Sequence, residues 1–253
     1  QIALNEMAKV AADGYTLGPI QIPAYVIQPR VRKPGQKGFT NEQFDFLGTH
    51  ARIPGALIVR KDSPFQTLGD LVKYAKANPK KLIASVAGIG SSNHAFLARV
   101  EKLTGIQTTV VSYKGGGTIL KALLGGDIAM LPANASSVAS NLKAGKLRAL
   151  VIGSPKRHKL FPNTPTLKES GVDMLLYSWR AVMAPKGVPA DRIKIIEDAL
   201  KKTAKSKTLK RLFAKMRIKA LPLYGDELVN TIKKEIVANK AIIKELGLRK
   251  KKK

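Results

Sequence analysis

The residue types that could do chemistry gather in three short segments that are glycine-rich or polar. Residues 88–94 read GIGSSNH, residues 113–118 read YKGGGT, and residues 132–137 read PANASS. Each segment follows a short apolar run and precedes a helical pattern, so each is expected to be a strand-to-helix turn. Ser91 and Ser92 can cap the helix that follows the first turn, where free N–H groups carry the positive end of the helix dipole. Such a terminus binds a carboxylate or a phosphate, although plain helix capping explains the same residues.

Other kinds of chemistry lack the residues they need. The first turn resembles a dinucleotide-binding fingerprint, but Asn93 occupies the third glycine position and no acidic residue closes the next strand. The three histidines, His50, His94 and His158, show no metal-ligand or nucleophile–base spacing, and no Gly-x-Ser-x-Gly elbow is present. The chain has no cysteine, which excludes thiol nucleophiles and Cys-ligated metals. We therefore expect a binding protein without cofactor or metal. An enzyme, such as a decarboxylase or hydrolase, is the least favoured of three possible functions, after a small-ligand carrier and a polyanion-binding protein.

The elements that must position these turns follow a regular rhythm. We expect strands over 82–87, 108–113, 128–132 and 147–152, and helices over 68–77, 92–103, 118–124 and 136–143. This alternation is typical of an α/β fold built from crossover units. Because each strand is short and almost continuously apolar, we expect a parallel sheet covered on both faces. All three turns would then lie at the carboxyl ends of parallel strands, where open α/β sheets bind ligands.

The segments on either side of this region have weaker patterns. We expect a helix over 2–12, strands over 15–20, 44–48 and 55–60, and C-terminal helices over 189–204, 206–216 and 225–246. No apolar run reaches the roughly 18 residues that a membrane-spanning helix requires.

The charge of the chain is strongly unbalanced. Its 45 Lys and Arg against 17 Asp and Glu give a formal charge of +28. Such a charge attracts polyanions, so a basic polyanion- or nucleic-acid-binding α/β protein is the alternative function. The cations are spread along the chain, however, and no helix-turn-helix, zinc finger or aromatic RNA-binding platform accompanies them. Solvated helix faces explain most of them, and we expect no nucleic-acid partner.

Several segments, each modest alone, run in the order of one known family over nearly the whole chain. They are ADGYTL (12–17), LGDL (68–71), YAKANP (74–79), GIGSSNH (88–94), YKGGG (113–117), ALLGG (122–126), LKAGKLRAL (142–150), PTLKESG (165–171), SW (178–179) and APKGVP (184–189). In this series the chain resembles the tripartite tricarboxylate transporter substrate-binding proteins, the Bug family of Gram-negative bacteria.

The resemblance implies a two-lobed periplasmic binding protein fold, type II-like, whose lobes are joined by hinge strands. Lobe one would comprise residues 1–60 and 180–253, and lobe two would comprise residues 61–179. A small organic carboxylate would be held between the lobes and delivered to the membrane permease subunits of a tripartite transporter. The protein would be a periplasmic monomer from which the signal peptide has been removed.

The resemblance also implies which residues hold the ligand. Carried over residue by residue, the lobe-two contacts are Gly90, Ser91, Ser92, His94, Gly116, Gly117 and Asn134. The family opens with a strand and a Pro/Gly-rich loop that this chain does not match, so we expect Gln1 to begin a mature form or a fragment, and lobe one offers only the turn at 22–24. Tyr113 is the one aromatic ring near the three turns, which favours an aliphatic dicarboxylate.

Overall fold

The computed structural model describes residues 2–30, 37–113, 115–159, 161–216, 218 and 220–245. The chain divides into two compact units, of which unit 1 comprises residues 1–53 and 179–253 and unit 2 comprises residues 54–178. Both boundaries fall within strands, because β2 (Phe44–Arg60) and β7 (Tyr177–Pro185) each begin in one unit and end in the other. The mixed α/β fold class is confirmed, whereas a hinge at these strands stays a prediction.

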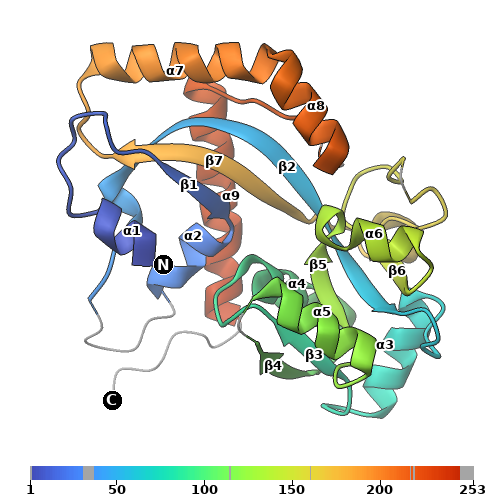
Figure 1. The fold of residues 1–253 in the computed structure, drawn as a ribbon. Coiled ribbons are helices and arrows are strands. Elements are labelled where there is room, and N and C mark those ends of the chain that lie inside the picture. Colours follow the sequence, from blue (N-terminus) through green and yellow to red (C-terminus); the bar gives the residue numbers. More distant parts are fainter. Residues whose placement is uncertain are drawn as a thin grey trace. The chain divides into compact units, whose positions relative to one another are not determined.

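Unit 1 is a sheet with helices on both faces (Figure 1). Its other elements are α1 (Ile2–Met7), β1 (Gly18–Ile22), α2 (Ala24–Ile27), α7 (Ala190–Lys205), α8 (Lys207–Met216) and α9 (Gly225–Glu245). Strand β7 pairs antiparallel with β1 and lies between β1 and β2 in the strand order. The helix expected over 2–12 ends at Met7, and the strand expected over 15–20 is displaced to Gly18–Ile22.

The alternation of side chains along β7 explains why both faces of this sheet are covered. Ala181 and Met183 join one apolar cluster, which includes residues of α2 and α9. Val182 and Ala184 belong to another cluster, which includes Leu47 and the inner side of α7. Successive residues of a strand point to opposite faces, so a short apolar run binds a helix layer on each side.

Unit 2 contains the three turns and the strands and helices on either side of them. Its elements are the second half of β2, α3 (Leu68–Ala77), β3 (Ile83–Val86), α4 (Ser92–Thr104), β4 (Thr109–Ser112), α5 (Gly116–Gly125), β5 (Leu131–Asn134), α6 (Ala139–Lys143) and β6 (Leu147–Ile152). Helix α3 has the bounds expected from its pattern. Its first turn is closed by a capping box, in which Thr67 Oγ1 accepts from the Asp70 N–H and Asp70 accepts from the Thr67 N–H.

The strands expected over 82–87, 108–113, 128–132 and 147–152 run in one direction, as expected, whereas β2 runs opposite to them. β3 pairs with β4 in parallel, but β2 pairs antiparallel with both β5 and β6. The antiparallel strand is thus the one that enters from unit 1, because β2 begins there and ends in unit 2. Short apolar runs indicate that strands are buried but carry no information about their direction.

The two strands expected over 44–48 and 55–60 are one strand, β2. Pro54 interrupts the apolar pattern and has no N–H to donate to a ladder. Its position is compatible with a strand because pairing with β5 begins at Gly55 and pairing with β6 begins at Ala56.

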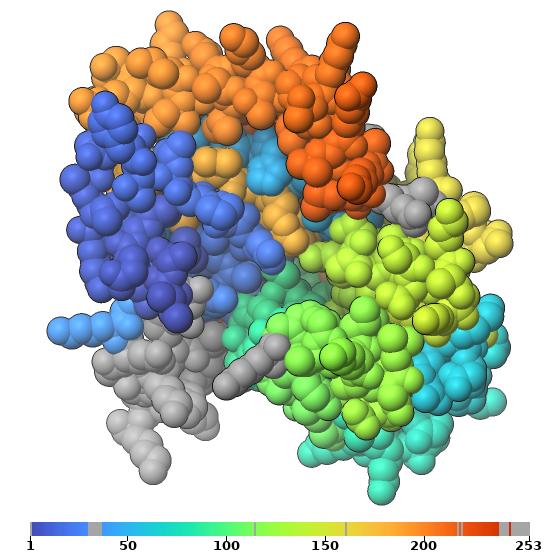
Figure 2. All heavy atoms as spheres, in the orientation of Figure 1, coloured from blue at the N-terminus to red at the C-terminus, as the bar shows by residue number. Residues whose placement is uncertain are grey.

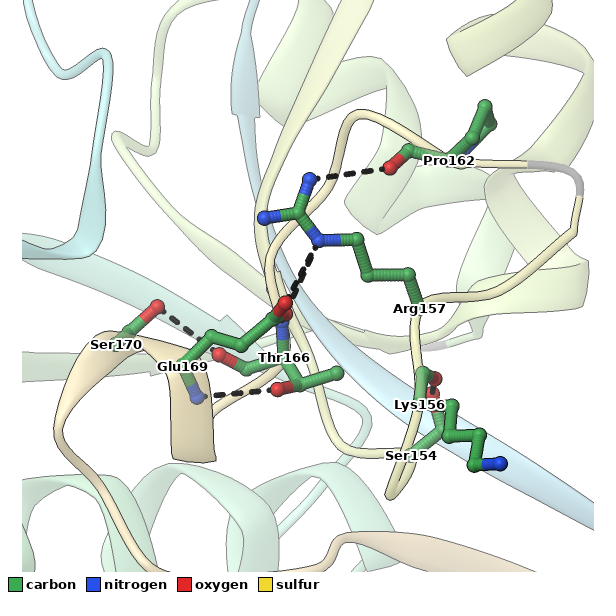
Figure 3. A network of polar contacts seen from close by, with 7 residues as sticks. All are labelled: Ser154, Lys156, Arg157, Pro162, Thr166, Glu169 and Ser170. Carbon is green, nitrogen blue, oxygen red and sulfur yellow. Dashed lines mark hydrogen bonds and ion pairs between the residues drawn. The ribbon is translucent and has the colours of Figure 1, made fainter.

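After β6, polar contacts hold a segment that has little regular structure (Figure 3). Arg157 Nε donates to both carboxylate oxygens of Glu169, at 2.9 and 3.1 Å. The Thr166 N–H donates to Glu169 Oε2 at 2.7 Å, and the Glu169 N–H donates back to Thr166 Oγ1 at 3.1 Å. The hydrogen bond from Thr166 and the charge of Arg157 lower the pKa of Glu169. Glu169 therefore joins two parts of the segment as a carboxylate.

Candidate ligand-binding site

The three turns leave the same edge of the unit 2 sheet. In the register of β3 and β4, Val86 pairs with Ser112, which is the last residue of β4. On the other side of β3, Ala84 forms a parallel bridge with Met130, immediately before β5. The strands β4, β3 and β5 thus run side by side in one direction, and the three turns follow their carboxyl ends, as expected from the sequence. Lys114, in the second turn, lies outside the described residues.

The first turn, between β3 and α4, is shaped by two glycines and braced by two side chains. Gly88 and Gly90 have φ of 115° and 80°, in the region that favours glycine over residues with a Cβ. Ser91 Oγ lies 2.6 Å from Gly88 O and 2.7 Å from Asn93 Oδ1. Asn93 Oδ1 also accepts from the Ala87 N–H at 3.3 Å. The path of the backbone through this turn is thereby fixed by its own residues.

The two adjacent serines at the start of α4 have different roles. Ser91 is the N-cap, and its Oγ accepts from the His94 N–H at 3.3 Å. Ser92 is the first helical residue, and its Oγ is buried without a hydrogen-bond partner among the described residues. Helical geometry also leaves the first N–H groups of α4 without acceptors inside the helix. A buried hydroxyl without a hydrogen-bond partner costs free energy, and a ligand that accepted its hydrogen bond would remove this cost.

His94 holds the first turn from within. Its side chain is buried, and Nδ1 accepts from the Gly90 N–H at 3.1 Å. Nδ1 must therefore be unprotonated, and the proton of the neutral ring lies on Nε2. Burial lowers the pKa of His94, which favours this neutral form. The geometry gives His94 a positioning role for Gly90.

The second turn presents open backbone at the start of α5. Gly115 is the N-cap with φ of 92°, and Gly116 and Gly117 are the first helical residues. A Cβ added at any of the three would meet no described atom within 4 Å. The three glycines therefore leave room for another molecule to approach the backbone closely.

Asn134 and the turn at 22–24 complete the set of expected contacts. Asn134 is the last residue of β5, pairs with Gly55 of β2, and precedes a short 3₁₀ turn that its side chain does not cap. In unit 1, Ile22 ends β1 and Pro23 precedes α2, and both are buried. The contact of every one of these candidates with a ligand stays a prediction.

Comparison with known proteins decides the family. A family model described as "Tripartite tricarboxylate transporter family receptor" matches residues 1–248. The chain belongs to this family. Receptors of this family are solute-binding proteins of the periplasm.

Two curated relatives match this receptor along nearly its whole length. The UPF0065 protein in the gbd 5' region of Cupriavidus necator is 32% identical over 248 residues, which cover 96% of this chain and 73% of the relative. The protein BugT of Bordetella pertussis is 28% identical, over 97% of this chain and 76% of the relative.

Solved structures of three proteins share the fold of the receptor. R. palustris Rpa4515 with adipate has a TM-score of 0.85 and 27% identity, covering 97% of this chain and 82% of that one. The periplasmic binding protein BugD has a TM-score of 0.84 at 23% identity, covering 98% and 83%. MatC from Rhodopseudomonas palustris with bound malate has a TM-score of 0.82 at 21% identity, covering 96% and 83%. Below 25% identity the likeness concerns the fold alone.

Two polar residues of the receptor were not singled out from the sequence, one in the first turn and one in the strand β3 before it. Asn93 was interpreted only as a missing glycine, yet its side chain braces the turn. Ser85, in the middle of β3, has a buried hydroxyl with no partner in the part of the chain that the structure describes. A lone serine in the otherwise apolar run 82–87 was the available signal.

The described residues of the receptor offer neither a metal site nor a membrane-spanning helix. Within the described ranges, no group of three His, Cys, Asp or Glu side chains is placed to hold a metal ion. None of the helices formed by the described residues is long and apolar enough to cross a bilayer.

Proposed function

We propose that this receptor captures a small aliphatic dicarboxylate in the periplasm and presents it to the membrane permease subunits of a tripartite transporter. Membership in the receptor family supports this function over an enzyme and over the polyanion-binding alternative. The adipate complex of a 27% identical protein supports the ligand class, and so does the malate in MatC, a protein of the same fold. We further propose that the receptor acts as a monomer.

The observation that carries the proposal is the start of α4. The buried Ser92 Oγ lacks a partner among described residues, and it adjoins the free N–H groups of a helix N-terminus. A carboxylate bound there would accept hydrogen bonds from the hydroxyl and from these N–H groups, and the helix dipole would favour its charge. Hydrogen bonds to a charged acceptor are worth about 1.5–3 kcal/mol each, roughly twice the neutral kind.

The supporting residues have defined parts in this proposal. His94 keeps the Gly90 N–H engaged at 3.1 Å, which stabilises the turn rather than the ligand. Gly116 and Gly117 leave open space at the neighbouring turn, so that the rest of the ligand can approach the backbone. Asn134, at the end of β5, offers an amide for a second polar contact.

A thermal-shift screen followed by calorimetric titration tests the ligand class. The screen compares adipate, malate and succinate with citrate and with monocarboxylates of matched length. A dicarboxylate at 100 times its dissociation constant should stabilise the folded state by about 2.7 kcal/mol, which raises the melting temperature by roughly 5–10 °C in a chain of this size. Monocarboxylates should give a much smaller shift.

Two results would contradict this proposal. The first is a flat response to every dicarboxylate by both thermal shift and calorimetry. The second is an equal response to monocarboxylates, which would mean that the second carboxylate makes no contact.

A further inference from the structure

Residues 199–205 of α7 and the whole of α8 carry charge of one sign. Residues 199–216 include seven cations and no Asp or Glu: Lys201, Lys202, Lys205, Lys207, Lys210, Arg211 and Lys215. Lys201 is paired with Glu197 and Asp198 of the preceding turn, at 3.5 Å each. The other six are exposed and form no ion pair with a described residue. Figure 2 shows long side chains of this orange region projecting from the surface.

Helix α8 has a packed face, a basic face and an exposed apolar edge. Leu209 and Phe213 pack against Ala51 and Ile53 of β2. The cations of α8 lie on the opposite face, by the helical spacing of three and four residues. Leu212 and Met216 are 48% and 49% exposed. They lie one turn apart, beside the packed face and next to the cations.

This arrangement differs from a surface on which both signs of charge are mixed. Solvated surfaces of soluble proteins usually intersperse both signs of charge. The first half of α7 does so, because Asp191, Glu197 and Asp198 lie among its cations. The run 199–216 departs from that pattern and adds two large apolar side chains that are half exposed.

We propose that this surface docks the receptor onto anionic phospholipid. The docking surface consists of Lys202, Lys205, Lys207, Lys210, Arg211 and Lys215 with Leu212 and Met216. Its cations would bind lipid phosphates, and its two apolar side chains would enter the boundary between headgroups and acyl chains. This inference goes beyond ligand capture and does not depend on it.

A lipid surface fits these residues better than an acidic protein does. Helices that lie in the plane of a membrane interface combine a Lys- and Arg-rich face with exposed apolar residues along one side. The cations are spread over two consecutive helices rather than gathered at one point, and a continuous sheet of headgroups can neutralise such a spread of charge. Each Lys or Arg near an anionic surface contributes about 1 kcal/mol, which is about fivefold in affinity.

Co-sedimentation of the full chain with lipid vesicles tests the inference. Vesicles of phosphatidylcholine with about one quarter phosphatidylglycerol should bind the wild type at about 0.1 M salt, where charges are screened beyond about 10 Å. Vesicles of phosphatidylcholine alone should not. The triple variant Lys205→Gln, Lys210→Gln, Lys215→Gln should bind on the order of 100-fold more weakly.

A matched control separates this surface from net charge. The variant Lys73→Gln, Lys76→Gln, Lys81→Gln has the same net charge, and these exposed lysines lie in or just after α3 of unit 2. It should lose less than about fivefold, the contribution of a single cation at the surface. The variant Leu212→Ser, Met216→Ser should also bind vesicles more weakly, with all melting temperatures checked against wild type.

Three results would overturn the inference. The first is a wild type that does not sediment with the anionic vesicles. The second is an equal loss of affinity in the two triple variants, which would mean that only net charge matters. The third is soluble polyglutamate that binds as tightly as the vesicles and loses affinity in the variant of Lys205, Lys210 and Lys215, which would assign the surface to an acidic protein.

Discussion

At the scale of single residues, identical neighbours can have separate roles. Ser91 and Ser92 were equivalent candidates for capping, but only Ser91 accepts the His94 N–H. The Ser92 hydroxyl is buried without a partner among the described residues. One position of the helix start thus caps the helix, and the hydroxyl of the next has no hydrogen-bond partner among the described residues.

The paired variants Ser91→Ala and Ser92→Ala should therefore behave differently. Loss of the N-cap in Ser91→Ala should lower the free energy of unfolding by about 1 kcal/mol. Ser92→Ala removes a buried hydroxyl that bonds to no described residue, so stability should stay the same or rise slightly. Its affinity for the dicarboxylate should fall by about 1.5–3 kcal/mol, the value of a charge-assisted hydrogen bond. Denaturant unfolding and calorimetric titration measure the two effects; unchanged affinity in Ser92→Ala would remove this residue from the site.

His94 should make stability depend on pH in a defined direction. An unfolded histidine titrates near pH 6.5, and burial lowers the pKa of His94 in the folded state. Below pH 6.5 the unfolded chain therefore binds more protons, so stability is full above that pH and falls as the pH drops toward the folded pKa. Burial, with the charge of Arg180, also lowers the pKa of His50, and burial lowers that of His158.

The variant His94→Gln isolates this contribution, because glutamine can still accept from the Gly90 N–H. Urea unfolding between about pH 5 and 8 should show a shallower decline for the variant than for wild type. Identical slopes in the two proteins would mean that His94 is not a source of the dependence.

At the scale of elements, α4 is placed by its contact with β2. A Cβ added to Gly55 would lie 2.4 Å from the Phe96 ring, which is buried on α4. The glycine in β2 therefore lets the ring of α4 approach the strand. This contact sets the distance between β2 and α4, and the first turn of α4 carries the candidate site.

Gly55→Ala should accordingly destabilise unit 2 and disturb the site. Overpacking of a core typically costs about 1–3 kcal/mol, and a displaced α4 should bind the dicarboxylate more weakly. Gly69→Ala is the matched control, since its Cβ would meet only Thr67 Oγ1, at 3.5 Å, in ordinary contact. In the first turn of α3 that change should stabilise by up to about 1 kcal/mol. Equal effects of the two substitutions on unfolding would contradict the packing argument.

At the scale of the whole molecule, the core is divided in the same way as the chain. Each of the apolar clusters lies within one unit: two belong to unit 2 and three belong to unit 1 among the described residues. Compact units with their own cores are the usual form of domains. The docking surface proposed for lipid lies in unit 1, and the turns proposed for the ligand lie in unit 2. The two proposals can therefore be tested on separate sets of residues.

The local pattern of the chain was enough to determine much of this protein. The bounds of α3 follow from apolar spacing and the Thr67–Asp70 capping box, which are local properties. The family follows from short segments in a constant order, and the three turns follow from glycine and serine between apolar runs. Backbone conformation and capping depend on residues a few positions apart, so a sequence is sufficient to predict them.

Only the tertiary structure decided the direction of β2 and the state of individual side chains. The antiparallel pairing of β2 depends on where a distant part of the chain enters unit 2, and the spacing of apolar residues is the same for either direction. Whether Ser91 or Ser92 has a hydroxyl without a partner among the described residues depends on the turn formed by Gly88 and Gly90 and on the burial of the Ser92 oxygen. Hydrogen-bond satisfaction is a property of three-dimensional surroundings, so two serines that are alike in sequence become different only in the fold.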